Sequence, residues 1–263
     1  MATESGQSKR RCEQRASGLG QLTLVEHALC PVDSRSGLVE NFVFDASYPF
    51  KTTDGRWRKA KARVICPAGL SSNDEFYLWG LLALTLEQPG SSTELLATPH
   101  YCLRQLGLIG DGTRIGGRQY QDFRAAIERL SLVSYINNHF YDPIRTEHCR
   151  VRFGFLSYRL PGNIASSRTW RFHWDTLFLN LVRATGGHCW FDLDTYRLLD
   201  TASRRLFLLV AKIFCRRETT PRFDLADLAT NVLGYARSLR PVDQKAKVAR
   251  CVARLAEVGV VRP

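Results

Sequence analysis

Apolar and polar residues recur along this chain at spacings that predict several amphipathic helices. In the last stretch, residues 241–258, apolar side chains fall on one helical face, at Val248, Val252, Leu255 and Val258. A separate face of the same stretch carries cations at i, i+3 and i+7, namely Lys247, Arg250 and Arg254. The pattern therefore predicts a closing helix that buries one side and exposes a basic stripe.

An earlier stretch, residues 118–132, has a similar build. Its apolar seam consists of Tyr120, Phe123, Ile127 and Leu130. Residues 127–133 (IERLSLV) align with residues 252–258 (VARLAEV), and each segment follows a Leu-Gly pair at nearly equal distance. These pairs are Leu106-Gly107 and Leu233-Gly234. Two related basic helices in one chain favour a tandem DNA-binding protein.

The first half of the chain predicts a three-helix unit with a β-hairpin. Residues 22–29 predict a short helix, and residues 41–49 and 57–66 predict strands joined at the turn signal Thr53-Asp54-Gly55. Ser72-Asn73-Asp74-Glu75 is interpreted as a capping box that opens a helix over 75–86. Thr98-Pro99 predicts a second helix to about residue 108, and the third covers residues 118–132. Residues 133–141 and 149–159 alternate like two strands. Three helices followed by a hairpin predict a winged helix, in which this hairpin is the wing.

The second half repeats this order of helices. A strand is expected over 170–174 and helices over 175–183, 201–214, 224–233 and 241–258, with a short strand or helix entry at 191–193. After the last helix too few residues remain for a second wing. The predicted fold class is α+β, with two tandem winged-helix units carrying short β-hairpins, the second lacking its C-terminal wing. The expected divisions are a disordered basic tail (1–20), a first domain (21–160), a linker (161–168) and a second domain (169–263).

Charge strengthens the nucleic-acid interpretation. The chain has 263 residues and a net charge of +12. Residues 201–263 hold 13 Lys and Arg against 5 Asp and Glu, a net +8, whereas residues 1–200 hold 24 against 20. Cationic charge concentrated around the predicted basic helix is typical of a polyanion-binding surface.

Metal, cofactor and membrane roles find little support. The 8 cysteines never form a C-x-x-C pair, so no metal or cofactor is expected, and free thiols in a reducing cytoplasm are the default. No apolar run of eighteen residues predicts a membrane span. The glycine-rich segment 110–117 follows a helix and lacks the Gly-Lys-Ser/Thr of a phosphate-binding loop, so it is interpreted as a connector.

The candidate DNA-binding residues lie in three places. The third helix of the first unit begins with Arg118, Gln119, Gln121 and Arg124. The expected wing carries Arg150 and Arg152, and the closing helix with its approach carries Arg240, Lys245, Lys247, Arg250 and Arg254. Arginine bonds guanine and glutamine bonds adenine in a bidentate manner, while lysine acts more as a point charge. The alternative for each set is a solvated polar face without a partner.

Several passages resemble the plasmid replication initiator protein A family, tandem winged-helix initiators of bacterial plasmids. They are residues 24–31 (LVEHALCP), 73–80 (NDEFYLWG), 170–175 (WRFHWD) and 203–209 (SRRLFLL). The resemblance implies binding to repeated duplex sites at a plasmid origin, strand opening helped by host factors, loading of the host replicative helicase, and dimerisation through the first unit. The expected function is thus a non-enzymatic initiator. The alternatives are a winged-helix transcriptional repressor and a metal-dependent nicking enzyme. For a nicking enzyme the sequence offers Tyr101 beside His100, Tyr141 close to His139, and a possible metal site where His139 and His148 flank Asp142 and Glu147.

Overall fold

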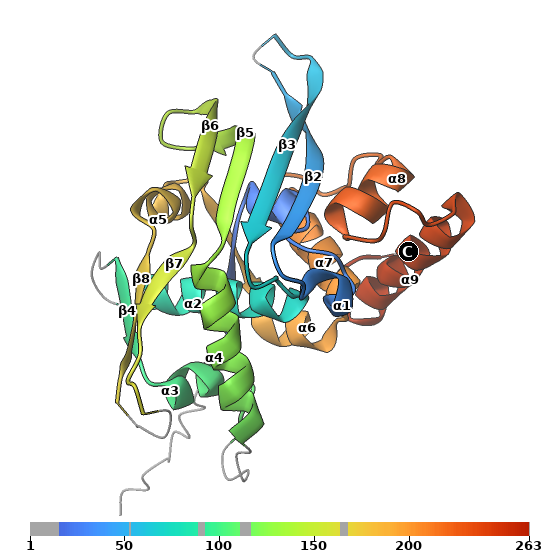
Figure 1. Ribbon diagram of the computed structural model, residues 1–263. Helices are drawn as coiled ribbons and strands as arrows, with labels where there is room; N and C mark the ends of the chain where they lie inside the picture. The colour runs from blue at the N-terminus through green and yellow to red at the C-terminus, as the bar shows by residue number, and fades with distance from the viewer. Residues whose placement is uncertain (1–15, 53, 89–92, 111–116, 164–167, 263) are drawn as a thin grey trace, which may run out of the picture.

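The fold belongs to the α+β class, as the pattern predicts, and its described residues contain three antiparallel sheets. The computed structural model describes residues 16–52, 54–88, 93–110, 117–163 and 168–262 (Figure 1). The largest sheet has the order β2-β3-β5-β6, with strands Phe42–Lys51, Trp57–Cys66, Ser134–Asp142 and Glu147–Phe153. The second sheet has the order β4-β8-β7, with strands Glu94–Ala97, Trp170–Trp174 and Leu156–Arg159. The third pairs β1 (Ser17–Gln21) with β9 (His188–Asp192).

The first helical unit has the winged-helix order of elements. Its helices are α2 (Ser72–Glu87), α3 (Pro99–Gln105) and α4 (Gly117–Ser131). Strand β4 lies between α2 and α3 in the chain. Strands β7 and β8 come after α4 and the intervening β5–β6 hairpin, and they complete the sheet of β4. As expected, Thr98 caps α3 by accepting a hydrogen bond from the Tyr101 amide, with Pro99 in the first turn.

The hairpin that forms the wing differs from the prediction. Residues 133–141 and 149–159 were expected to form it, but β5 and β6 pair with the β2–β3 hairpin in the large sheet. The continuous strand expected over 149–159 is interrupted at Gly154, where the chain leaves β6 and enters β7 in the other sheet. The wing is the β7–β8 hairpin. Strand periodicity identified the strands, but it carries no information on their partners.

Two expected boundaries are also corrected. Leu156–Arg159 pairs with Trp170–Trp174, so the segment expected as an interdomain linker (161–168) connects neighbouring strands of one sheet; residues 164–167 lie outside the described residues. Residues 17–20, expected in the disordered tail, belong to β1, where Leu19 is fully buried. The remainder of that tail up to residue 15 lies outside the described residues. Pairing with a strand 170 residues away gives no local sequence signal.

The second helical unit contains α7 (Thr201–Phe214), α8 (Leu225–Asp227) running into η2 (Leu228–Val232), and α9 (Pro241–Glu257). Asp200 and Asp224 cap α7 and α8 through their carboxylates. The described residues after α9, up to Arg262, form no strand. The shorter elements are η1 (Leu24–Glu26), α1 (Ser34–Gly37), α5 (Thr176–Arg183) and α6 (Leu193–Leu198).

The Leu-Gly repeat corresponds to the same turn in both units. Gly107 follows α3 and Gly234 follows η2, with φ values of +65° and +79°. Glycine adopts this left-handed conformation without steric cost, so each pair ends one helix and redirects the chain toward the next basic helix. The repeat seen in the sequence is therefore a repeated helix–turn–helix.

Replacing Gly234 by alanine is expected to destabilise the protein by about 1–3 kcal/mol, the usual cost of a non-glycine residue held in such a backbone region. The added Cβ would also lie 2.8 Å from the Cys30 carbonyl oxygen. Gly117→Ala is the matched control, because no atom of the described residues lies within 4 Å of its added Cβ. Urea denaturation of both variants measures the difference, and equal midpoints would contradict this role of Gly234.

The start of α2 uses a different capping box from the expected one. Ser71 is the N-cap, and its amide donates to Asp74 Oδ2 at 2.7 Å. Asp74 also accepts two hydrogen bonds from Arg129 on α4, at 2.7 and 2.8 Å. Glu75, which the sequence suggested as the capping carboxylate, is free of that role and forms a buried contact with the second unit.

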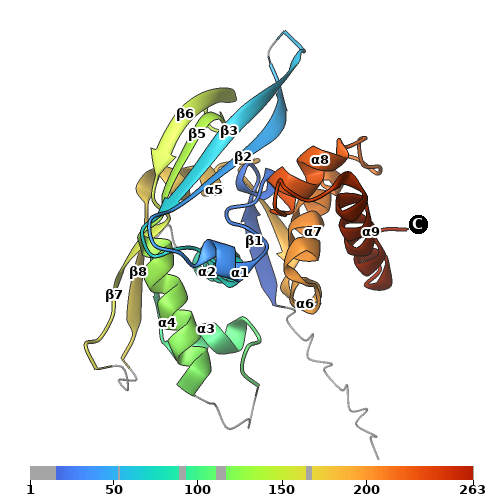
Figure 2. The same ribbon diagram turned by 45° about the vertical axis from the view of Figure 1, so that its right-hand side comes forward.

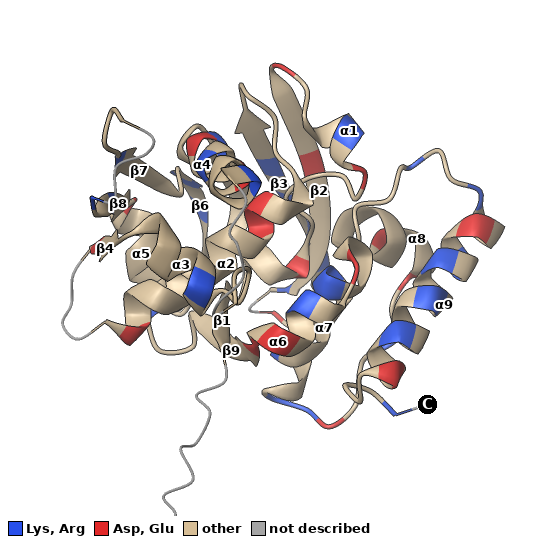
Figure 3. Cartoon of the chain, turned by 90° about the horizontal axis from the view of Figure 1, so that it is seen from below, with Lys and Arg blue, Asp and Glu red and all other residues tan. Residues whose placement is uncertain are grey.

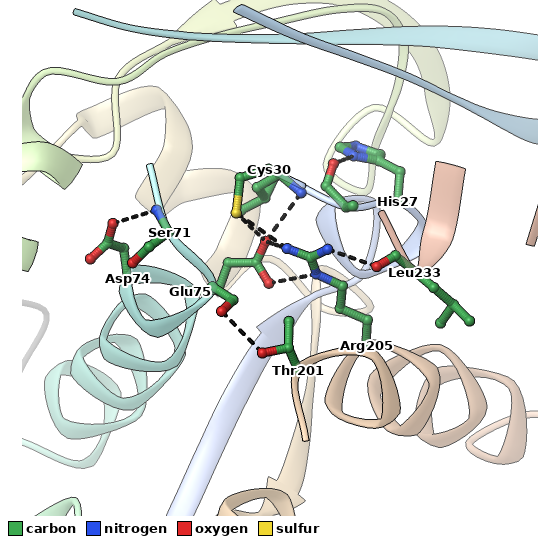
Figure 4. Close-up of polar contacts among 11 residues, drawn as sticks. His27, Cys30, Ser71, Asp74, Glu75, Thr201, Arg205 and Leu233 are labelled. Atoms are coloured by element: carbon green, nitrogen blue, oxygen red, sulfur yellow. Dashed lines mark hydrogen bonds and ion pairs between the residues drawn. The ribbon is translucent and has the colours of Figure 1, made fainter. Parts of the chain in front are cut away.

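This contact is a buried ion pair between α2 and α7 (Figure 4). Arg205 donates from Nη2 and Nε to the two Glu75 oxygens at 2.7 and 3.0 Å, and from Nη1 to the Leu233 carbonyl at 2.8 Å. Both side chains are 5 % exposed. Burial is the largest single influence on the pKa of Arg205 and lowers it, but the charge and hydrogen bonds of Glu75, together with the neighbouring Cys30 and Tyr196, raise the pKa overall. The pair therefore joins the two helical units through charged groups that are fully satisfied.

Candidate DNA-binding surface

Helix α9 packs one face against α7 and the α8–η2 segment and leaves the other face in solvent. Its buried side chains are Gln244, Val248, Cys251 and Leu255. The predicted seam was therefore partly wrong, because Val252 is 46 % exposed and Cys251 takes its place. The helix is amphipathic as expected, but its buried face is rotated slightly from the one inferred from valines and leucine alone.

Basic residues recur along α9, as the view from below shows (Figure 3). Lys245 and Arg250 are exposed, and neither has an ion pair within the described part of the chain. They flank a strip of small exposed residues formed by Ala246, Ala249 and Ala253. Alanines on the outward face allow a helix to approach a groove closely, and alanine makes apolar contact with thymine methyl groups. The sequence prediction missed this strip, although the helical spacing of the alanines was visible.

The other cations of this region are held by contacts within the protein. Lys247 Nζ lies 4.9 Å from the centre of the Tyr235 ring, a cation–π contact. Arg254 donates to the Leu198 carbonyl at 3.1 Å and pairs with Glu257 at 2.6 Å. Arg240 pairs with Asp243 at 2.9 Å. Of the predicted stripe Lys247, Arg250 and Arg254, Arg250 alone has no ion pair, side-chain hydrogen bond or cation–π contact among the residues that the structure describes.

Helix α4 exposes the polar residues expected at its start. Phe123, Ile127 and Leu130 are buried and Tyr120 is half-buried, as predicted. Gln119 and Gln121 are exposed, and Arg118 lies 3.8 Å from Asp122. Arg124 is held to Glu128 at 2.9 Å. In Figures 1 and 2 the start of α4 and the far end of the β7–β8 hairpin both lie at the lower end of the molecule.

The two arginines assigned to the wing lie elsewhere. Arg150 and Arg152 are exposed on β6, in the sheet shared with β2 and β3, and Arg152 donates to Ser134 Oγ at 3.2 Å. The wing next to α4 instead carries Arg159 and Arg171, both exposed, with Arg171 3.5 Å from Glu94. These two residues were missed because the wing was assigned to the wrong hairpin.

The residues weighed for metal-dependent chemistry have structural contacts. The rings of His139 and His148 lie 4.6 and 4.8 Å from that of Phe50. Burial and the nearby His139 lower the pKa of His148, which favours its neutral form. Within the described ranges, no group of three His, Cys, Asp or Glu side chains is arranged to hold a metal ion. No helix in those ranges is long and apolar enough to cross a bilayer.

Comparisons with known proteins find solved structures of similar shape but do not assign the chain to a family. The chain matches no protein-family model and no curated protein. Among solved structures it is similar to a crystal structure of RctB domains 2 and 3, with 13 % identity, a TM-score of 0.48, and coverage of 83 % of this chain and 81 % of that one. A selenomethionine crystal structure of the same two domains gives 14 % identity, a TM-score of 0.49, and coverage of 88 % and 83 %.

Proposed function

We propose that this protein is a non-enzymatic, sequence-specific DNA-binding protein that initiates replication at repeated sites of a plasmid origin. The observation that carries the proposal is the outward face of α9. There the unengaged cations Lys245 and Arg250 flank a strip of alanines on the second helix of a helix–turn–helix. Such a helix fits the major groove, where arginine reads guanine and lysine contacts phosphate.

The first unit supports the same function with a second reading helix. Gln119 and Gln121 are exposed at the start of α4, at a position where helix termini approach bases. Two helix–turn–helix units in one chain match a target made of repeated or paired half-sites. The resemblance of residues 24–31 and 203–209 to plasmid initiators favours replication over repression. Host replication factors such as the replicative helicase, and a second copy of the chain, are the expected protein partners.

The proposed function is tested by footprinting on duplex DNA that surrounds the protein's own gene. An initiator is expected to protect several repeats beside an AT-rich tract. Protection of a single operator would favour the repressor instead. Nicking of a supercoiled plasmid by the pure protein with Mg²⁺ would contradict the non-enzymatic assignment.

Replacing Arg250 by alanine is expected to weaken binding to the footprinted duplex about 10-fold or more, since a good arginine–guanine contact contributes roughly 1–3 kcal/mol. Lys245→Ala should instead reduce the slope of log affinity against log salt by about 0.9, the value for one lost phosphate contact. Fluorescence anisotropy between 50 and 200 mM salt measures both. Arg35→Ala removes one exposed charge from α1 and is the matched control. If Arg250→Ala and Arg35→Ala bind equally well, α9 is not the reading helix.

A further inference from the structure

An open cleft of about 380 Å³ lies at a place that the DNA-binding helices do not use. Its walls come from the β2–β3 hairpin, the β5–β6 hairpin, the segment around η1, and the end of α7 with the residues that follow it. Figures 1 and 2 show both hairpins projecting from the same side of the molecule. The volume is within the range of small-ligand sites. We call it the hairpin cleft, and its principal lining residues are Lys51, Trp57, Tyr141, His148, Arg216 and Arg217.

Aromatic side chains form one part of this lining. Trp57 is 68 % exposed and Tyr141 is 36 % exposed, so both rings meet solvent where they face the cleft. The His148 ring lies 5.4 Å from that of Tyr141 and 4.8 Å from that of the buried Phe50, so His148 packs against both rings. An indole this exposed gains little from the fold itself, because most of its surface remains in water. The Trp57 ring is therefore free to stack on a flat ligand.

Cations form the other part of the lining. Lys51 lies directly opposite Trp57 in the β2–β3 ladder, so the two side chains share one face of the hairpin. Arg216 and Arg217 follow the end of α7 and, with Lys51, have no ion pair among the described residues. The acidic side chain of the lining is Glu26, which already pairs with Lys212 at 2.6 Å. The cleft therefore keeps a positive excess beside its aromatic rings.

We propose that the hairpin cleft binds unpaired nucleotides of a single DNA strand. A base would stack on Trp57, and the adjoining phosphates would be contacted by Lys51, Arg216 and Arg217. Aromatic rings in a basic groove bind single strands without sequence preference, since every base has a flat face to stack. A double helix hides those faces, so duplex DNA does not satisfy the aromatic part of the site. This inference goes beyond the proposed binding of duplex DNA by α4 and α9. An experiment can contradict either proposal without contradicting the other.

The test is binding of a fluorescein-labelled 12-nucleotide oligo(dT) by the full chain, measured by anisotropy at fixed salt. Trp57→Ala is expected to weaken this binding about 10-fold, as loss of a base-stacking ring typically does, whereas Trp57→Phe should retain most of it. Trp190→Ala is the matched control, because Trp190 is 44 % exposed and lies outside the cleft. Arg216→Ala with Arg217→Ala should lower the salt slope by about 0.7 for each lost phosphate contact.

The comparison ligands separate the possible results. An abasic strand of the same length has the same charge and is expected to bind about as weakly to wild type as oligo(dT) binds to Trp57→Ala. Arg250→Ala should leave oligo(dT) binding unchanged while it weakens duplex binding, and Trp57→Ala should do the reverse. Equal oligo(dT) binding by Trp57→Ala and Trp190→Ala would overturn the proposal. Binding of free dTMP as tight as that of the strand would overturn it in favour of a free-nucleotide site.

Discussion

Arg205→Met is expected to lower the free energy of unfolding by about 3–5 kcal/mol, the usual cost of removing one partner of a buried ion pair. The substitution leaves the Glu75 carboxylate, which is 5 % exposed, without its two guanidinium hydrogen bonds. It also leaves the Leu233 carbonyl without a donor at the turn before α9. Urea denaturation followed by circular dichroism measures the loss.

Two further variants make this result specific to the pair. The double variant with methionine at both Glu75 and Arg205 should be more stable than Arg205→Met alone, because no unpaired charge remains buried. Arg35→Ala, on the exposed surface of α1, should change stability by less than about 0.5 kcal/mol. A loss in Arg205→Met as small as in Arg35→Ala would show that the pair does not hold the two units together.

The second large effect is a loss of stability that is expected in acid because of His27. Burial lowers the pKa of His27 from its ordinary value of 6.5 to about 4. Its Nδ1 donates to the Ala28 carbonyl at 2.9 Å, so Nε2 is the acceptor for the Tyr135 hydroxyl at 2.9 Å. Tyr135 in turn accepts from Asn137 at 2.7 Å. The network is satisfied by a neutral imidazole, because a proton on Nε2 would take away the acceptor of the Tyr135 hydroxyl.

The direction of the stability change with pH depends on which state of the chain, folded or unfolded, binds the proton. Between pH 6.5 and about 4 the unfolded chain protonates His27 and the folded chain does not, so stability falls as the pH is lowered through this window. His27 is expected to lower the free energy of unfolding by about 3 kcal/mol over this window, since each pKa unit corresponds to 1.36 kcal/mol. Urea midpoints of wild type and His27→Gln, measured from pH 7 to 4, isolate the contribution. His100→Gln, at an exposed histidine, is the control. Parallel pH profiles for wild type and His27→Gln would contradict the assignment.

The sequence alone determined the local elements of this protein, because helices, caps and turns depend on residues a few positions apart. The seam of α4, the Thr98 cap of α3 and the helical span of α9 all follow from spacing and side-chain chemistry. The two Leu-Gly pairs even revealed a repeated turn, since both glycines adopt positive φ.

Only the tertiary structure decided how these elements combine. Which hairpin is the wing depends on pairing between Glu94–Ala97 and Trp170–Trp174, and the strand pattern is the same for any partner. Glu75 looked like a capping residue and is instead joined to Arg205, 130 positions along the chain. Arg250 is exposed and has no ion pair among the described residues, whereas Arg254 donates to the Leu198 carbonyl, although the two share one helical stripe. Each outcome depends on a neighbour that is distant in sequence, and helical or strand periodicity describes only the residue's own element.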